Sequence, residues 1–569
     1  MDRRRPVAQL AALTLGLGGM LVAGCGDNLA FATHAVTLDR VVRTAALPGC
    51  AWASPVVTAG PDPLVVVATG EGVIAAYEPG GAIRWQTTLP APPDRRAWIA
   101  ATPAVVDGSL VIAWQVTAAA GSTRHAHQVG VLDAVTGALD PAFPIVTLAA
   151  TKPATGGGVV TFNAPTQFSR ATIIAARRPG DTLGVAYVSV GNIQDIQPWH
   201  GWVFELDLDR WRAAGADAAI ASVLLTTPET DCGPPGDSGA DDMRCGGGIW
   251  TPSGPTLVPT AGGEYELWIP TGNGALDLTR GDYANAILRV GRGLAFEPGC
   301  DERCDGFDPL APDPGCMASC ADLFMPRLRV DDPPLAPPGG RCDGLSFLAC
   351  YAKLDLDLGA SAPVRVDALG QRFGVLPAKD GAVYLFDADH LGTLHDRLAL
   401  RPFCGTGGDD CTAHWAGTMV TRPAVATVDG APLIVVPTFY FDRSNPAGVV
   451  GLEIVPGASG PVLREKWSAP HRDAPEALTR FREHTGRAII VERAGTPYVV
   501  IADPGPERSR DGVLYAIDAR TGAIADRGAL DGPGHKYIEP AVVGDRVFVT
   551  SCETIMDGPT HLEGWTITP

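Results

Sequence analysis

The chain has 569 residues, in which 63 acidic side chains outnumber 44 basic ones and give a formal charge of −19. This charge disfavours contact with a nucleic-acid backbone, so we expect no nucleic-acid partner. The 68 glycines and 50 prolines, with charged residues at only 19%, are typical of many short strands joined by turns rather than of helices or disorder.

The N-terminal segment has the pattern of an export signal. A basic start, Arg3-Arg4-Arg5, precedes an apolar run from Pro6 to Ala23 that is too short and too glycine-rich to be a good membrane span. Val22-Ala23-Gly24-Cys25 then resembles the lipobox of bacterial lipoproteins, in which the cysteine carries the lipid. We therefore predict a signal peptide over residues 1–24, lipidation at Cys25, a tether over residues 25–34 and a mature protein anchored at the bacterial cell envelope, on its periplasmic face or at the cell surface.

A short motif, in which a proline precedes an apolar run, recurs along the rest of the chain. Its copies are Ser54-Pro55-Val56, Thr102-Pro103-Ala104, Gly254-Pro255-Thr256, Ala362-Pro363-Val364, Arg422-Pro423-Ala424 and Glu539-Pro540-Ala541. Two spacings are about double the usual one, so each is expected to hide a further unit, near Ala171–Ile174 and near Ala488–Val491. Because such units cannot bury both sheet faces alone, they must stack. The repeat predicts an all-β, eight-bladed propeller that forms a single domain over residues 35–569.

The two ends of this domain are expected to meet. Few residues follow Pro540, whereas residues 35–47 alternate like a strand and belong to no unit of their own. Propellers commonly close by pairing an N-terminal strand into the last blade, which hides two sheet edges at once. Such closure would bring Cys50 and Cys552 together.

The cysteines predict disulfides. Besides Cys25 there are twelve, an even number in a chain that is expected to be exported. Cys232/Cys245 and Cys404/Cys411 are predicted local loop closures. Six more crowd a segment over residues 297–350, which we interpret as a disulfide-rich insertion; its spacings also leave zinc open as an alternative. These six are Cys300, Cys304, Cys316, Cys320, Cys342 and Cys350.

Several units end in a recognisable pattern. Val131–Gly137 (VLDAVTG) and Leu514–Gly522 (LYAIDARTG) resemble the repeat signature of pyrroloquinoline quinone (PQQ) propellers. Two further pairs of segments resemble the wider quinoprotein dehydrogenase-like superfamily. They are Gly246–Trp250 with Trp268–Gly274, and Asp355–Pro363 with Lys379–Asp387. The resemblance implies an eight-bladed propeller and, in active members, PQQ and calcium in a central funnel. This chain has no adjacent Cys-Cys roof and no Cys-x-x-Cys-His haem motif.

The loops that precede the innermost strands should point towards the central channel. They carry Trp52, Trp98, Arg170, Trp250, Asp357, His414, Trp415, Lys536 and Glu539. Aromatic rings with a few convergent polar groups are typical of a binding funnel, although tryptophans also pack between blades. We expect a cofactor or ligand to contact Trp250, Arg170, Asn273, Trp415 and Lys536. Asp357 and Glu539 are the candidate catalytic bases.

Two metal sites are possible from the residue types. Asn273, Asp277 and Asp282, with Asn285 nearby, offer oxygen ligands for calcium within one loop, although such residues also cap turns. His414 and His535 with Glu539 offer ligands for a transition metal. The alternative is that the two histidines are ordinary polar residues of the surface. Lys379-Asp380-Gly381 is interpreted as a charged hairpin turn.

The expected function is a non-catalytic binding or assembly scaffold at the cell envelope, with envelope proteins or a small-molecule or glycan ligand as partners. This would resemble the propeller lipoprotein that helps to assemble outer-membrane β-barrels. One alternative is a PQQ-dependent dehydrogenase that oxidises alcohols or sugars. Another is a carbohydrate- or peptide-binding propeller with a structural calcium.

The lipobox gives the first testable prediction. Cys25→Ser should abolish lipidation and release a soluble protein, because the acyl chains on the cysteine supply the predicted anchor. Fractionation of cells into membrane and soluble parts measures this. Retention of the variant with the membranes would contradict the predicted anchor.

Overall fold

The structure is a computed structural model of the 569-residue chain. It describes residues 36–120, 123–192, 196–233, 244–329, 344–400, 421–438, 447–470, 481, 485–503, 511–534, 536–554 and 558–569. The predicted signal peptide, Cys25 and the tether lie outside the described residues. Within the described part of the chain, no helix is both long and apolar enough to cross a membrane.

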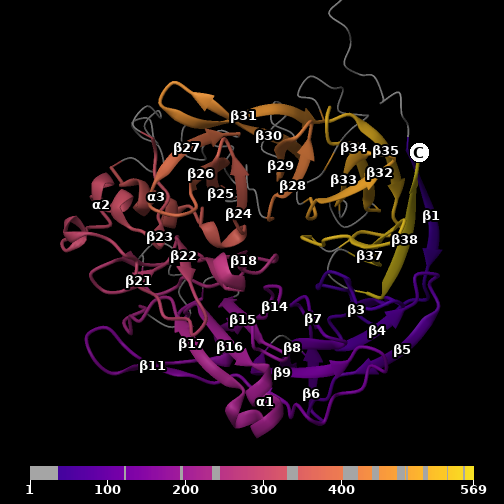
Figure 1. The fold of residues 1–569 in the computed structure, drawn as a ribbon. Helices are drawn as coiled ribbons and strands as arrows, with labels where there is room; N and C mark the ends of the chain where they lie inside the picture. The colour runs from indigo at the N-terminus through magenta and orange to yellow at the C-terminus, as the bar shows by residue number, and fades with distance from the viewer. Residues whose placement is uncertain are drawn as a thin grey trace, which may run out of the picture.

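Across these residues, eight antiparallel sheets stand around a common centre and form a propeller, as the sequence predicts (Figure 1). Blade 1 consists of β2 (Val56–Val57), β3 (Val65–Ala68), β4 (Val73–Tyr77) and β5 (Ile83–Thr88). Blade 2 consists of β6 (Arg95–Trp98), β7 (Ala104–Val106), β8 (Ser109–Ala118), β9 (Arg124–Asp133) and β10 (Val146–Thr147). Blade 3 consists of β13 (Gln167–Phe168), β14 (Ile174–Ala176), β15 (Val185–Asn192), β16 (Trp202–Asp207) and β17 (Ile220–Leu225).

The remaining blades repeat the arrangement. Blade 4 consists of β18 (Thr256–Pro259), β19 (Tyr265–Pro270), β22 (Ile287–Val290) and β23 (Leu323–Phe324). Blade 5 consists of β24 (Val364–Ala368), β25 (Gln371–Pro377), β26 (Ala382–Asp387) and β27 (Leu394–Ala399). Blade 6 consists of β28 (Ala424–Val428), β29 (Ala431–Thr438), β30 (Gly448–Gly457) and β31 (Gly460–Ala469). Blade 7 consists of β32 (Ile489–Arg493), β33 (Thr496–Asp503), β34 (Val513–Asp518) and β35 (Ile524–Ala529).

Other elements decorate the blades. Two hairpins are β11 (Thr151–Pro153) with β12 (Val159–Thr161), and β20 (Leu276–Asp277) with β21 (Asp282–Tyr283). The α-helices are α1 (Leu208–Ala214), α2 (Pro314–Ser319) and α3 (Phe347–Lys353). Short 3-10 turns are η1 (Ala164–Thr166), η2 (Ala216–Ala218), η4 (Ala261–Gly263), η5 (Glu302–Cys304) and η6 (Leu358–Ala360).

Each repeat marker stands directly before an innermost strand of a blade, and in blade 2 the short strand β6 precedes the marker. Pro55 precedes β2, Pro363 precedes β24 and Pro423 precedes β28. The two units without a proline start at β14 and β32, where the sequence predicts them. A proline suits this position because it lacks the N–H that a central strand would need and it ends the loop that enters the strand.

The Asp-x-x-Thr-Gly turns also join neighbouring blades. Asp133 Oδ1 accepts hydrogen bonds from the backbone N–H groups of Val135 and Thr136, and Gly137 has a φ of 73°. A Cβ on Gly137 would lie 2.2 Å from the ring of Trp85, which belongs to blade 1. The turn therefore needs glycine both for its backbone and for the close approach of that ring. Trp467 of blade 6 meets the corresponding turn of blade 7 in the same way, around Gly522.

Blade 8 closes the ring with strands from both ends of the chain. It consists of β36 (Ala541–Val543), β37 (Arg546–Cys552), β38 (Thr560–Thr568) and β1 (Thr37–Arg43). β1 runs antiparallel to β38, from Thr37 opposite Thr568 to Arg43 opposite Glu563. Figure 1 shows the earliest and the latest colours of the chain meeting in this blade. The predicted closure is thus confirmed, and a Cys50–Cys552 disulfide joins the two ends.

The other cysteines in the described ranges are also disulfide-bonded. Cys232 bonds to Cys245, as predicted. In the cysteine-rich segment the pairs are Cys300–Cys320 and Cys304–Cys316, and Cys350 is disulfide-bonded too, so disulfides rather than zinc hold these residues. Cys342, Cys404 and Cys411 lie outside the described residues.

The segment over residues 297–350 is more than an appended insertion, which corrects the sequence interpretation. β23 lies within it and pairs with β22 as the outer strand of blade 4. Leu323 and Phe324 of this strand are fully buried in the cores of the blade. The blade therefore needs this segment to complete its sheet.

The closing strand gives the second prediction. Val42 is 5% exposed, and its side chain packs directly against Gly81 and Gly564. Its neighbour Val41 is 48% exposed. Val42→Asp should lower the free energy of unfolding by several kcal/mol, because it buries an unpaired charge where blade 8 closes. Val41→Asp is the matched control and should change it by less than about 0.5 kcal/mol. Urea unfolding compares the two, and equal stabilities would show that β1 is only a tether.

Candidate functional site

The loops before the innermost strands meet at the centre of the ring and bond to one another from blade to blade. The Ser54 N–H donates to Thr102 Oγ1 over 3.0 Å, which links blades 1 and 2. The Glu539 N–H donates to Ser54 Oγ over 2.9 Å, which links blade 8 back to blade 1. Equivalent bonds are Thr172 Oγ1 to Pro252 O, Thr256 Oγ1 to Pro363 O, and Ser361 Oγ to Thr421 O. These bonds fix the loops that carry the candidate site.

A buried charge cluster lies in this central region. Lys379 Nζ donates to Asp357 Oδ2 over 2.5 Å and to Asp355 Oδ1 over 3.1 Å. Trp250 Nε1 donates to the other oxygen of Asp357, Oδ1, over 3.1 Å. The Lys379 ammonium also lies 4.8 Å from the centre of the Trp250 ring. Both oxygens of Asp357 are therefore occupied, and the lysine sits between the two carboxylates.

Burial governs the electrostatics of this cluster. Asp357 is 1% exposed and Lys379 is 2% exposed. Burial raises the pKa of Asp357 to about 7, although the nearby Lys379 acts in the opposite direction. Lys379-Asp380-Gly381 does form the charged hairpin turn that the sequence predicts, and the side chains of Lys379 and Asp380 are both buried. This turn, Ala378–Ala382, points the lysine inwards.

Arg170 lies among aromatic rings in the same region. Its guanidinium carbon is 4.9 Å from the ring centre of Tyr537, 5.7 Å from that of Phe168 and 5.8 Å from that of Trp250. Tyr537 belongs to the loop before blade 8 and Trp250 to the loop before blade 4, so these contacts span the centre of the ring. Tyr537, Ala360 and Trp250 also pack together as an apolar cluster. Desolvation lowers the pKa of Arg170.

A second aromatic and cationic group lies beside the first. Trp52 and Trp98 stack edge to face with their ring centres 5.1 Å apart, and Trp98 lies 5.3 Å from Phe168. The buried Arg124 guanidinium lies 5.2 Å from the Phe168 ring and is held by Gln115. Trp52 and Trp98 therefore lie close to Arg170 through Phe168.

The sequence did not single out several contributors to this region. Phe168, Tyr537 and Arg422 flank the markers or sit in loops, and no motif sets them apart. Arg422 Nη2 donates to the carbonyls of Ser253, Gly254 and Pro255, and burial lowers its pKa to about 9. The sequence signal that could have identified Arg422 is its position, because it directly precedes the proline marker Pro423.

The other predicted funnel residues have identifiable partners. Glu539 forms an ion pair with Arg487, and burial lowers the pKa of that arginine. Lys536 Nζ lies 5.3 Å from the centre of the Tyr537 ring. Glu539 is therefore held by a cation rather than free to act as a base. His414, Trp415 and His535 lie outside the described residues.

The side chain of Asn273 forms hydrogen bonds to backbone groups in this structure. Its Nδ2 donates to the carbonyl of Ala352 over 3.1 Å, and its Oδ1 accepts from the Gly274 N–H over 3.0 Å. The Asn285 amide also reaches Asn273 Oδ1, at 3.4 Å. At 3% exposure, Asn273 shapes the loop under the cluster and presents no oxygen to the funnel.

The three predicted calcium ligands have separate local roles. Asp277 caps its turn by accepting from the backbone and hydroxyl of Thr279. Asp282 lies opposite Asp277 in the β20–β21 hairpin and is buried, and burial raises its pKa to about 7. Among the described residues, no three carboxylates come within reach of one ion. Asp282 Oδ1 and Asn285 Oδ1 are nevertheless buried without a hydrogen-bond partner, so a calcium site in this loop stays a prediction.

The charge cluster gives the third prediction. Lys379→Met should lower the free energy of unfolding by about 3–5 kcal/mol near pH 8, because it leaves Asp357 and Asp355 without the ammonium between them. The pKa of Asp357 is raised in the folded state to about 7. The contribution of this carboxyl to the free energy of unfolding therefore falls as the pH rises from about 4 through about 7. The loss should therefore shrink towards pH 5, where Asp357 takes up a proton.

Urea unfolding at both pH values measures this loss. Lys353→Met is the matched control, since Lys353 is exposed on α3 and should leave stability nearly unchanged. A Lys379→Met protein as stable as the wild type near pH 8 would contradict the role of this pair.

Comparison with known proteins places the fold. No family model and no curated protein sequence matches the chain. Among solved structures, quinohemoprotein alcohol dehydrogenase from Comamonas testosteroni is similar over 93% of this chain and 76% of its own, with 12% identity and a TM-score of 0.51. Quinohemoprotein alcohol dehydrogenase ADHIIG from Pseudomonas putida HK5 gives the same coverage and identity with a TM-score of 0.53. A europium-containing methanol dehydrogenase covers 93% of both chains, with 13% identity and a TM-score of 0.52. The chain thus has the eight-bladed propeller fold of the quinoprotein dehydrogenases.

Proposed function

We propose that this protein is a non-catalytic binding or assembly propeller of the bacterial cell envelope, lipid-anchored through Cys25, whose central site binds a planar, anionic small molecule. The observation that carries the ligand class is Arg170 among three aromatic rings at the centre of the ring. The disulfides support an oxidising compartment such as the periplasm.

The state of Arg170 points to an anionic ligand. Among the described residues, the Arg170 guanidinium contacts the rings of Phe168, Trp250 and Tyr537 and forms no ion pair, and desolvation lowers its pKa. Cations that leave water are normally paired, because an unpaired charge in a desolvated place is costly. A carboxylate on a ligand would supply the partner, while the faces of Trp250 and Tyr537 would cover a flat ring.

The state of the acidic residues argues against turnover. A general base must reach the proton that it removes. Asp357 is almost fully buried, with one oxygen held by Trp250 and the other by Lys379. Glu539, the other candidate, is paired with Arg487. Neither carboxylate is free to meet a substrate hydroxyl in this arrangement.

PQQ, which the fold implies, fits this site in part. Its flat ring and carboxylates suit Trp250 and Arg170, and when bound it would supply a quinone able to accept two electrons. The calcium that accompanies it does not fit. The Lys379 ammonium occupies the space between Asp355 and Asp357 where a cation would sit, and Asn273 turns its oxygen to the backbone.

The second candidate function is a PQQ-dependent dehydrogenase of alcohols or sugars. One observation favours it: the pKa of Asp357, raised to about 7, suits a general base at neutral pH. It requires Lys379 to leave Asp357 so that one carboxylate oxygen becomes accessible.

Ligand binding gives the fourth prediction. PQQ should quench the tryptophan fluorescence of the purified protein, and Arg170→Gln should weaken this binding at least about tenfold, because it removes the charge-assisted contact to a carboxylate. Arg212→Gln is the matched control, since Arg212 is exposed on α1. Equal affinities of the two variants would contradict the proposed site.

The same samples separate the two candidate functions. We expect no dye-linked oxidation of alcohols or sugars after addition of PQQ and calcium. Activity that disappears in Asp357→Asn would overturn the non-catalytic proposal and support the dehydrogenase.

A further inference from the structure

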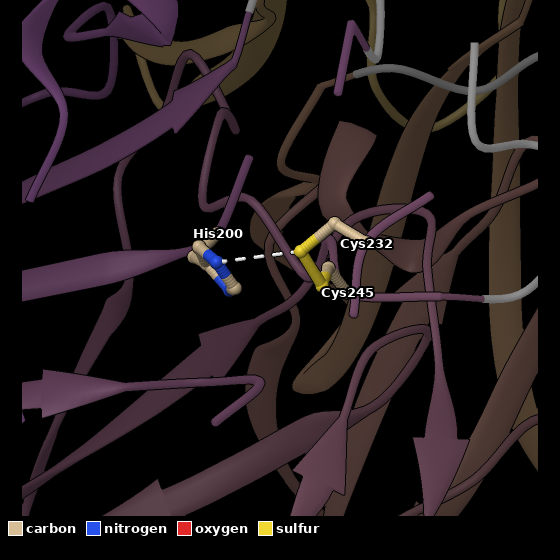
Figure 2. Close-up of side chains that lie close together, drawn as sticks. All are labelled: His200, Cys232 and Cys245. Atoms are coloured by element: carbon tan, nitrogen blue, oxygen red, sulfur yellow. Dashed lines mark hydrogen bonds between the residues drawn. A yellow bond between two sulfur atoms is a disulfide. The ribbon is translucent and has the colours of Figure 1, made fainter. Parts of the chain in front are cut away.

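A buried histidine lies against the Cys232–Cys245 disulfide, away from the charge cluster described above. His200 stands just before β16, Cys232 follows β17, and Cys245 begins the segment that runs to Trp250. Figure 2 shows the His200 ring turned towards the sulfur of Cys232, with the disulfide beyond it. All three side chains are less than 9% exposed.

The backbone brings these residues together independently of the disulfide. His200 and Gly246 form a parallel bridge, in which the Gly201 N–H donates to Gly246 O over 2.9 Å and the Gly246 N–H donates to Trp199 O over 3.0 Å. A Cβ on Gly201 would lie 1.9 Å from Gly247 O, so glycine permits this close approach. The geometry around the sulfurs is therefore held by main-chain bonds that reduction of the disulfide would leave in place.

The orientation of His200 is fixed by one of its nitrogens. Nδ1 lies 2.8 Å from the carbonyl of Thr227, which can only accept, so Nδ1 carries the proton. Nε2 then presents a lone pair, 3.6 Å from Cys232 Sγ. A disulfide sulfur has no proton to donate, and no other described residue reaches this nitrogen. Burial lowers the pKa of His200 to about 4, so the ring is neutral.

This arrangement matches the pattern of a metal-binding histidine. Such residues commonly donate one ring N–H to a backbone carbonyl and turn the other nitrogen to the metal. The ligand atoms of His200, Cys232 and Cys245 all lie within 4.8 Å of one another. The carbonyl oxygen of Glu229 lies 3.3 Å from Cys245 Sγ and 3.9 Å from Cys232 Sγ, where a fourth ligand would stand.

We propose that, once the Cys232–Cys245 disulfide is reduced, its two thiolates and His200 Nε2 form a site for a borderline-soft divalent cation of the zinc class. A dithiol reductant supplies two electrons and two protons and becomes a disulfide itself. A phosphine supplies the two electrons and becomes the phosphine oxide, while one water molecule supplies the oxide oxygen and the two protons. Either reaction converts the Cys232–Cys245 disulfide to two thiols. The cation then displaces both thiol protons and binds the two sulfurs and the nitrogen. The fourth position is taken by the Glu229 carbonyl or by water.

Charge and geometry both suit this ion. Two thiolates and a neutral imidazole together balance the charge of a divalent cation, so the buried site carries no net charge. A tetrahedral zinc with Zn–S of about 2.3 Å places two sulfurs about 3.8 Å apart, which needs only side-chain rotation once the covalent bond is broken. Disulfide and metal are mutually exclusive at this position, so the site holds metal only under reducing conditions.

Cobalt is the probe for this site, because Co²⁺ bound by thiolates gives a charge-transfer absorption band. The full mature protein is reduced with a phosphine without oxygen, and mass spectrometry after alkylation verifies that Cys232 and Cys245 are free. We expect one Co²⁺ with this band to bind at these two cysteines, to be displaced by Zn²⁺, and to raise the Tm of the reduced protein. His200→Gln, which keeps the disulfide for folding, should weaken Co²⁺ binding at least about tenfold.

Two controls isolate the site. Cys304→Ser/Cys316→Ser removes the Cys304–Cys316 disulfide and takes one member from the other group of neighbouring cysteines, Cys300, Cys304 and Cys320, and should leave the band unchanged. His127→Gln changes another buried histidine, whose ring faces the carbonyl of Ala164, and should leave the affinity unchanged. The proposal is overturned if the reduced wild type binds no Co²⁺, if Cys232→Ser/Cys245→Ser keeps the band, or if His200→Gln binds like the wild type.

Discussion

The pairing of β1 with β38 is the contact on which the ring depends. Without it, blade 8 would end at β38 and expose a row of unpaired backbone groups, and its outer edge would be open. The Cys50–Cys552 bond lies next to this pairing and spans 502 residues of sequence. It restricts the unfolded chain strongly, because the entropy of closing a loop grows with its length. The Glu539 N–H bond to Ser54 Oγ, which joins blade 8 to blade 1 at the centre, lies where the ring closes.

Closure brings charged groups from different blades into a desolvated centre. Lys379 of blade 5 is satisfied there by Asp357 and Asp355, which the chain supplies from the preceding loop. In the described part of the chain, Arg170 contacts three aromatic rings and has no acidic partner. The first arrangement pairs its charges within the protein, whereas the second is the one on which the proposed anionic ligand rests. One fold hosts many functions, so the fold alone cannot separate a binding role from catalysis. The proposed binding role rests instead on this contrast between Lys379 and Arg170.

The segment from Cys245 to Trp250 connects the Cys232–Cys245 disulfide to the central charge cluster. At one end it carries the cysteine beside His200, and at the other it carries the tryptophan that bonds to Asp357. Glycines at positions 246 to 248 let its backbone lie directly against the loops of Gly191, Gly201 and Asn273. A change at the sulfurs would thus act on a tightly packed backbone that leads to the central site.

The sequence by itself determined the number of blades, the strand that closes the ring and the Cys50–Cys552 bond. These follow from local patterns and chain order: each proline marker precedes an innermost strand, and a lone N-terminal strand must pair with the incomplete last blade. Only the tertiary structure decided that Lys379 is buried and that Arg170 meets Tyr537. It also decided that Asn273 faces the backbone and that His200 turns its lone pair to Cys232. Burial and the direction of a side chain depend on atoms contributed by distant segments, so no local pattern contains them.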